Sequence, residues 1–161
     1  MPEVFVEGLE DNARQSMVDL LNETLSDTIA MTLAVKQAHW NLKGQGFIGV
    51  HELLDDVAGR LREASDLMAE RAVILGGIAK GTAEEVALDS KVEAYPLDIT
   101  DIEDHVRALT DRFKAFGKTL RKGIEAAGEA GDDDTEDLLT EVSRAADKDA
   151  WFIGANSPKS K

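Results

Sequence analysis

Two histidines and three carboxylates in the first half of the chain have the residue types and the spacing to bind a transition metal. They are His39, His51, Asp55, Asp66 and Glu70. His51 and Asp55 are four residues apart, as are Asp66 and Glu70, so each pair shares one face if the segment is helical. Imidazole and carboxylate ligands without a thiolate favour iron, manganese or zinc. The pattern predicts a His/carboxylate metal site, and the simpler alternative is a charged helix with a surface histidine.

The spacing between Asp55 and Asp66 limits how these ligands combine. Eleven residues of helix return a side chain to the same face but move it roughly 16 Å along the axis. A metal–ligand bond is about 2 Å long, so one metal cannot touch both carboxylates of one chain. Either there are two separate sites, or an antiparallel copy supplies the missing half. A two-fold axis near Arg60 would set His51 and Asp55 against Asp66 and Glu70 of the partner, and would create two equivalent sites per dimer.

Apolar residues recur at helical spacing in four long stretches, which begin near residues 11, 47, 100 and 132. The first two run to about residues 40 and 75. The paired glycines at 44 and 46 and at 76 and 77 are expected to end them. Two threonine–glutamate pairs resemble capping boxes, Thr82 with Glu85 and Thr100 with Glu103. The stripe of the fourth helix is expected at four positions: Leu138, Val142, Ala145 and Phe152.

These elements predict an all-α fold, a ferritin-like four-helix bundle with a short helix in the long connection between helices two and three. We expect residues 1–10 to form an N-terminal tail, residues 11–156 the bundle domain and residues 157–161 a C-terminal tail. The 161 residues suit one domain. The absence of cysteine excludes disulfides, thiolate zinc sites and iron–sulfur clusters. No signal peptide or membrane span is expected, and a cytoplasmic location fits.

Three segments then resemble the Dps family, the DNA-binding proteins from starved cells. They are residues 36–44 (KQAHWNLKG), 47–55 (FIGVHELLD) and 66–72 (DLMAERA). The resemblance continues through residues 75–77, 95–99, 132–135, 147–148 and 151–153, and so covers nearly the whole chain beyond residue 11. It implies a bacterial cytoplasmic protein, with association with the nucleoid left open. It also implies a hollow homo-dodecamer of tetrahedral symmetry built from two-fold dimers.

The resemblance further implies a ferroxidase centre at the two-fold interface. His39, His51 and Asp55 would come from one subunit, and Asp66 and Glu70 from its partner. Such a centre oxidises Fe(II), preferably with hydrogen peroxide, and ferric mineral is stored in the cavity. Asp55 and Glu70 would supply the main anionic ligands, His51 a neutral nitrogen, and Asp66 and His39 direct or water-mediated contacts. Zinc or manganese would serve as substitute metals for the same ligands.

Three further residues have open roles. Trp40 lies beside His39 and either packs in the core beside the turn or intercepts stray oxidising equivalents. Lys36, one turn earlier, either pairs with a site carboxylate or is a surface lysine. His105 stands alone in the sequence and is expected to be a surface histidine or one with its hydrogen bonds satisfied.

The acidic run from Asp132 to Asp137 has two compatible interpretations. It resembles the region that lines the three-fold pores of the family, where carboxylates would draw cations inward. It also complements the positive end of the fourth helix. Trp151 and Phe152 are expected to be packing or interface residues.

The charge distribution does not favour DNA binding, despite the family name. The formal net charge is −14, and residues 1–13 contain no lysine or arginine. Phosphate neutralisation needs several cations, whereas the C-terminal tail offers only Lys159 and Lys161. The first hypothesis is therefore an iron-storage ferroxidase. A nucleoid DNA-binding protein with secondary iron oxidation is the second, and a purely structural bundle is the third.

Overall fold

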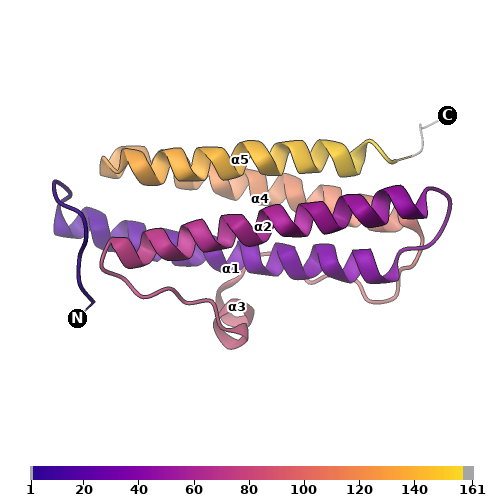
Figure 1. The fold of residues 1–161 in the computed structure, drawn as a ribbon, viewed down its shortest axis with the longest axis horizontal. Helices are drawn as coiled ribbons and strands as arrows, with labels where there is room; N and C mark the ends of the chain where they lie inside the picture. The colour runs from indigo at the N-terminus through magenta and orange to yellow at the C-terminus, as the bar shows by residue number, and fades with distance from the viewer. Residues whose placement is uncertain (1, 158–161) are drawn as a thin grey trace.

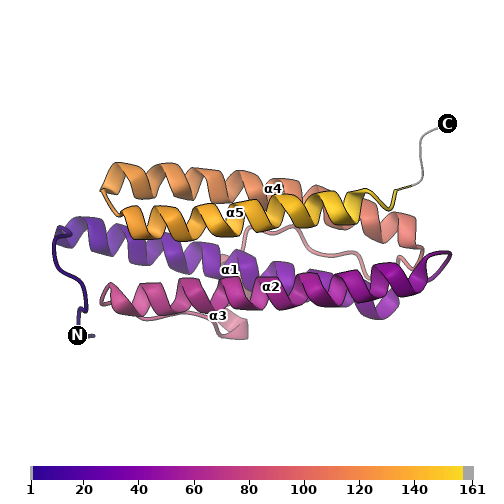
Figure 2. The same cartoon turned by 45° about the horizontal axis from the view of Figure 1, so that its top comes forward.

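Four long helices lie side by side and form a bundle in the computed structural model, which describes residues 2–157 (Figure 1). The elements are α1 (Asp11–Asn41), α2 (Phe47–Ile74), α3 (Ala83–Asp89), α4 (Ile102–Ala130) and α5 (Asp133–Gly154). α1 packs against α2 and α4, and α5 packs against α4 and α2. The short α3 lies outside the bundle against α1, and the view in Figure 2 shows the same arrangement. The predicted all-α bundle with a short helix in its long connection is confirmed.

On α5 the core is displaced by one residue from three of the four predicted positions, whereas the fourth, Val142, is buried as predicted. The positions predicted at Leu138, Ala145 and Phe152 are only partly buried, whereas the next residues, Leu139, Ala146 and Ile153, are fully buried. The reason is Asp149, which occupies a core-facing position of α5 and is 1% exposed. Its carboxylate accepts a hydrogen bond from Arg60 Nη2 on α2 at 2.6 Å. A stripe drawn through apolar residues alone misses this position and is therefore placed one residue early.

Of the two predicted capping boxes, one is present by its threonine cap alone. Thr82 caps α3, since its hydroxyl accepts from Glu85 N at 3.4 Å. The box predicted at Thr100 is wrong, because α4 begins at Ile102 and its cap makes no side-chain hydrogen bond. Instead, Lys43 N donates to Thr100 O at 2.8 Å, and Ile102 N donates to Lys43 O at 3.1 Å. The loop after α1 thus provides the backbone partners that a capping side chain would otherwise supply.

The glycines after α2 end it as predicted and allow the N-terminal residues to pack there. Gly76 has φ +88°, and a Cβ at this position would lie 2.6 Å from Val4 Cγ2. Phe5 N donates to Ile74 O at 3.0 Å. The residues before α1 therefore follow the end of α2 without forming a helix. Of the predicted C-terminal tail, residues 158–161 lie outside the described residues.

Buried polar side chains of α1 and α4 hold the long connection to the bundle. Asp27, on α1, accepts from Ser90 Oγ at 3.0 Å and from Lys91 N at 2.7 Å. Arg112, on α4, donates to Ala94 O at 2.5 Å. Asp27 and Arg112 are both less than a tenth exposed. Because unpaired buried groups are costly, these bonds fix the path of a segment that has few apolar contacts of its own.

His105 also holds the long connection to the bundle, and its side chain does not lie on the surface. Its ring is 1% exposed, and Nδ1 lies 2.8 Å from Tyr95 Oη in the connection. The expectation of a histidine with its hydrogen bonds satisfied is met at Nδ1 but not at Nε2, which is buried without a partner among the described residues. Burial lowers the pKa of His105, so the folded protein favours the neutral ring.

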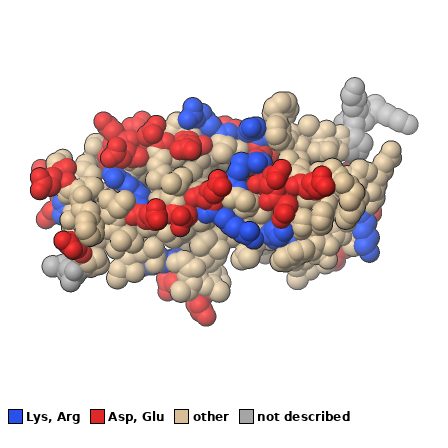
Figure 3. Space-filling model, in the orientation of Figure 1, with Lys and Arg blue, Asp and Glu red and all other residues tan. Residues whose placement is uncertain are grey.

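The acidic run at the start of α5 divides into a buried member and exposed ones. Asp132 is 2% exposed and accepts from Arg71 Nη2 at 2.6 Å and from Thr135 N at 3.1 Å. Asp132 is therefore the N-cap of α5 and cannot line a pore as the sequence pattern predicted. Asp133 and Asp134 are exposed, and acidic side chains gather over the beginning of α5 in Figure 3. Among residues 2–157, no helix combines the length and apolar character needed to cross a membrane.

Replacement of Asp132 by alanine should lower the free energy of unfolding by about 3 kcal/mol, because it removes the buried carboxylate that pairs most closely with Arg71 and leaves α5 without its cap. Urea denaturation at a fixed protein concentration measures the effect. Asp133→Ala is the matched control. It removes an exposed carboxylate from the same helix end and should cost about 0.5 kcal/mol. Equal losses in the two variants would show that Asp132 has no structural role beyond its charge.

The lowered pKa of His105 predicts a loss of stability on acidification. The unfolded chain takes up a proton at this ring below about pH 6.5, whereas the folded chain resists it, so stability falls as the pH drops through that window. The loss is at most about 1.4 kcal/mol per pH unit. In His105→Phe the difference in stability between about pH 7.5 and pH 5.5 should be smaller than in the wild type. An unchanged difference would assign the acid sensitivity to other groups.

Candidate metal centre

Two histidines face each other at the turn between α1 and α2. His39 lies in the last turn of α1, and His51 lies near the start of α2. Their rings stack with centroids 3.7 Å apart and planes 18° apart. His39 Nδ1 lies 2.8 Å from His51 O, and His51 Nδ1 lies 2.8 Å from His39 O. These two hydrogen bonds therefore join the end of α1 to the start of α2.

This reciprocal pairing fixes which ring nitrogen donates in both histidines. A carbonyl oxygen only accepts hydrogen bonds, so each Nδ1 must carry the proton. In the neutral ring, Nε2 then holds a free lone pair, which is the form of imidazole that binds a metal. Backbone carbonyls commonly orient metal-binding histidines in this way. His39 and His51 are thus held as two parallel nitrogen donors.

Asp55 lies one turn beyond His51 on α2 and interacts with a lysine of α1. Lys36 Nζ lies 2.7 Å from Asp55 Oδ1. The carboxylate is 63% exposed, whereas the lysine side chain is only 15% exposed. The hydrogen bond and the charge of Lys36 lower the pKa of Asp55, so the carboxylate is ionised and available as a ligand. Of the two roles expected for Lys36, the pairing with a site carboxylate is confirmed.

Trp40 does not belong to the core. Its side chain is 66% exposed, which contradicts the expectation of a packed core aromatic beside the turn. The neighbouring Ala38 and His39 face the bundle, so Trp40 projects outward from the last turn of α1. Lys36 Nζ lies 5.6 Å from the centroid of its ring. Trp40, Lys36 and Asp55 therefore form a short chain of contacts across the outer surface of α1 and α2.

The remaining two predicted ligands are not brought to this cluster by their own chain. Asp66 and Glu70 are exposed and lie three and four turns further along α2 than Asp55. Within residues 2–157, no three histidine or carboxylate side chains gather closely enough to hold a metal ion. One chain thus holds the predicted ligands in two groups, one near the turn between α1 and α2 and one further along α2.

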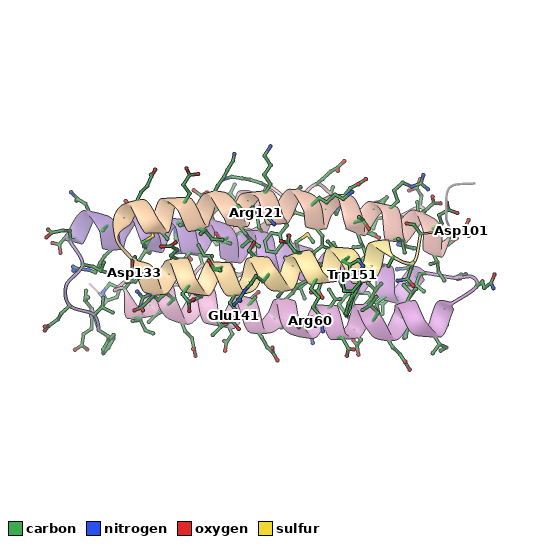
Figure 4. All side chains as sticks on the ribbon, turned by 90° about the horizontal axis from the view of Figure 1, so that it is seen from above. Arg60, Asp101, Arg121, Asp133, Glu141 and Trp151 are labelled. Atoms are coloured by element: carbon green, nitrogen blue, oxygen red, sulfur yellow. The ribbon has the colours of Figure 1, made fainter. Side chains whose placement is uncertain are left out.

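Asp149 is a buried acid that sequence reasoning missed, although it is structural. Arg60 and Asp149 join the middle of α2 to α5, and Figure 4 shows Arg60 about midway along the bundle. Burial raises the pKa of Asp149 even though Arg60 opposes this shift. The signal available in the sequence was its spacing of three from Ala146 and four from Ile153, in register with the apolar stripe. The reciprocal bonds of the two histidines had no such signal.

The aromatic pair near the end of α5 is only partly packed. Trp151 is 68% exposed, and its ring centroid lies 5.0 Å from that of the half-buried Phe152. Figure 4 shows Trp151 near the end of α5, where it lines a surface pocket together with Arg107 and Thr110 of α4. Of the two expected roles, packing within the chain does not describe Trp151.

Comparison with known proteins shows which family this chain resembles in sequence and fold. The ferritin-like domain model matches residues 18–157. The DNA protection during starvation protein of Agrobacterium fabrum is 45% identical over 148 residues, which are 92% of this chain and 91% of that protein. The match with this relative includes the stretch in which all five predicted ligands lie.

Solved structures agree with the sequence comparison. A Dps protein from Mycobacterium smegmatis superposes with a TM-score of 0.91 and 32% identity, over 96% of this chain and 93% of that one. A Dps protein from Vibrio cholerae, described as a member of a broad superfamily of ferritin-like diiron-carboxylate proteins, superposes with a TM-score of 0.86 and 24% identity, over 96% of each chain. This second likeness concerns the fold alone. From the family model and the closely related sequences together, the chain belongs to the Dps family of ferritin-like proteins.

Proposed function

We propose that this protein is an iron-storage and detoxification ferroxidase whose active centres are shared between subunits. The observation that carries the proposal is the division of the ligands. His39 and His51 each direct Nδ1 to a backbone carbonyl and leave Nε2 as the ligand atom beside an ionised Asp55, whereas Asp66 and Glu70 lie too far along α2 to join them. Membership of the Dps family of ferritin-like proteins supports iron as the metal.

A second copy of the chain would complete each centre. An antiparallel α2 related by a two-fold axis near Arg60 sets Asp66 and Glu70 of one chain opposite His51 and Asp55 of the other. The apolar side chains of Leu33, Ile48 and Leu67 are 60%, 60% and 42% exposed on α1 and α2, which is unusual for helix faces that remain in water. Six such dimers would form the hollow dodecamer that the family resemblance implies.

The chemistry assigns each side chain a limited task. Asp55 and Glu70 supply negative charge to Fe(II), His51 supplies a neutral nitrogen, and His39 and Asp66 complete the set directly or through water. Fe(II) is the substrate, and hydrogen peroxide is the proposed oxidant. Two Fe(II) ions lose one electron each, and one peroxide with two protons becomes two water molecules. Because both electrons leave together, no hydroxyl radical is released.

The exposed acids at the start of α5 support a route for the substrate. Asp133 and Asp134 are exposed, and Asp137 follows one turn later on the same helix. Copies of this helix end around a three-fold axis would place rings of carboxylate along a pore, which attract cations. Asp132 takes no part, because its carboxylate is bonded to Arg71.

DNA protection is the alternative function, since the relatives that match carry that name. The surface offers little support for it. Glu3, Glu7 and Glu10 are exposed before α1, and Figure 3 shows acidic and basic side chains interspersed along α2 without a basic stripe on that face. Twelve copies would multiply weak contacts through avidity, but each copy carries a formal charge of −14. We therefore propose that iron oxidation, and not DNA binding, is the principal activity.

Mixed assemblies test whether the centre is shared. Asp55→Asn and Glu70→Gln should each abolish rapid peroxide-dependent oxidation of Fe(II) as pure proteins. In a dimer that contains one chain of each kind, one centre carries both changes and the other carries neither. Random assembly of equal amounts should therefore restore about one quarter of the wild-type activity. The measurement is Fe(II) loss after anaerobic loading and addition of peroxide.

Glu63→Gln is the matched control, because it neutralises another exposed carboxylate of α2 outside the predicted set. It should retain full activity alone and in mixtures. Wild-type rates in the pure Asp55→Asn or Glu70→Gln protein would refute the ligand assignment. If both are inactive and verified mixed assemblies recover nothing, the centre is not shared in the proposed way.

DNA binding is tested by a gel shift at about 0.15 M salt, where screening matches physiological conditions. We expect no shift of a linear duplex at protein concentrations that saturate the ferroxidase reaction. A variant with Glu3, Glu7 and Glu10 replaced by lysine should shift the duplex, because each acidic copy then gains several phosphate-binding groups. A clear shift by the wild type at low concentration would favour the alternative function.

A further inference from the structure

The middle of α2 carries a glycine and an arginine on the face that holds the predicted ligands. Gly59 lies one turn after Asp55, and Arg62 lies one turn before Asp66, so the four residues share that face. We infer that, in the two-fold dimer, Arg62 of each copy fills the space that Gly59 of the other copy leaves open. This contact sets the register and the separation of the two α2 helices. The inference rests on the proposed function, because it concerns the contact that completes the same centres.

The single chain gives no reason for a glycine at position 59. A Cβ built on Gly59 would meet no heavy atom within 4 Å, and the residue lies well inside α2 with ordinary helical backbone. Glycine inside a helix is less favourable than alanine, because its unfolded backbone has more freedom to lose. A Cβ on Gly77, by contrast, would collide with Val18, so the fold itself explains that glycine. A second helix that approaches the bare backbone of Gly59 supplies the missing reason.

The register that joins the ligands also brings Gly59 to Arg62. In an antiparallel pair of helices, residues equally far from the two-fold axis face each other. If Asp55 of one copy faces Asp66 of the other, the axis passes midway between these positions. Gly59 and Arg62 each lie four residues closer to that midpoint, so they also face each other across the contact. Each copy thus offers one space and one long side chain, and the two contacts are equivalent.

Exposed apolar residues near the ends of α2 support the same register independently. Ile48 lies two turns before Asp55 and is 60% exposed, and Val73 lies two turns after Asp66 and is 43% exposed. Both are therefore on the ligand face and equally far from the midpoint. In the proposed register, Ile48 of one copy faces Val73 of the other. The pair of helices would then bury apolar side chains at both ends and place Arg62 over Gly59 in the middle.

Arg62 also places positive charge between the two centres. Each proposed centre gathers carboxylates from Asp55 of one copy and from Asp66 and Glu70 of the other. Two guanidinium groups near the axis reduce the repulsion among these carboxylates before iron arrives. The guanidinium is charged at every physiological pH and needs a long, wide space, which a glycine on the facing helix provides. Size and charge therefore favour the same pairing.

The test exchanges the two residues. In Gly59→Arg alone, an arginine faces Arg62 of the other copy, so bulk and like charge should force the α2 helices apart. The rate of peroxide-dependent Fe(II) oxidation should fall about a hundredfold, because a displacement of about 1 Å at a reacting site can cost that much. Gly59→Arg combined with Arg62→Gly again sets one arginine against one glycine, and should recover most of the wild-type rate. Calorimetric titration with Zn(II) measures the completeness of the centre without the reaction, and should show the same loss and recovery of affinity.

Gly49→Arg is the matched control. Gly49 also lies on α2, and a Cβ built there would meet no heavy atom within 4 Å, but its place six residues before Asp55 directs it to a different side of the helix. This variant should keep the wild-type rate and the wild-type affinity for Zn(II). Circular dichroism should show native helix content in Gly59→Arg, since nothing in its own chain obstructs the new side chain.

A wild-type rate and affinity in Gly59→Arg would overturn the inference. It would equally be overturned if the exchanged variant is helical but no better than Gly59→Arg. The mixed assemblies of Asp55→Asn and Glu70→Gln separate this failure from that of the proposed function. If those mixtures recover activity and the exchange does not, the centre is shared and only the pairing of Gly59 with Arg62 is refuted. If the mixtures recover nothing, the shared centre fails and the inference fails with it.

Discussion

The straightness of α2 is the constraint on which the proposed centre depends. A helix that rises about 1.5 Å per residue holds Asp55 and Asp66 on the same side but roughly 16 Å apart. No side-chain rotamer closes that gap, and the buried residues of α2 prevent the helix from bending toward itself. In an antiparallel pair of α2 helices, Asp55 of one chain would lie opposite Asp66 of the other. The same distance would then separate the two equivalent centres of the dimer. In the proposed centre, helix geometry would thus link catalysis to assembly.

Short hydrogen bonds then determine how well each half-site is formed. The reciprocal bonds between His39 and His51 fix two imidazole tautomers and join α1 to α2 without any capping side chain. Elsewhere, buried polar groups perform comparable tasks. Two ion pairs tie α2 to α5. Arg60, at the middle of α2, pairs with Asp149, and Arg71, near the end of α2, pairs with Asp132. Because an unpaired buried charge is costly, each pair specifies one arrangement of the helices.

Periodicity was sufficient to predict most of the architecture, and its failures have physical causes. The four long helices and the short α3 follow from apolar spacing, glycine positions and the cap at Thr82. The stripe of α5 was misplaced because Asp149 is a charged residue in the core, which apolar pattern alone does not recognise. The cap at Thr100 was wrong because a distant backbone, that of Lys43, satisfies the start of α4. Of the two roles considered for Trp40, packing in the core was wrong, because its position on the helix directs it outward.

The sequence by itself determined the identity of the predicted ligands, their spacing along one helix and the conclusion that one chain cannot unite them, because the rise of a helix does not depend on its surroundings. Only the tertiary structure decided which atoms of His39 and His51 remain free, that Lys36 already contacts Asp55, and that Asp132 is consumed by Arg71. These facts depend on side chains that meet across separate helices. The local sequence does not reveal these contacts, because they form only when the helices of the bundle pack together.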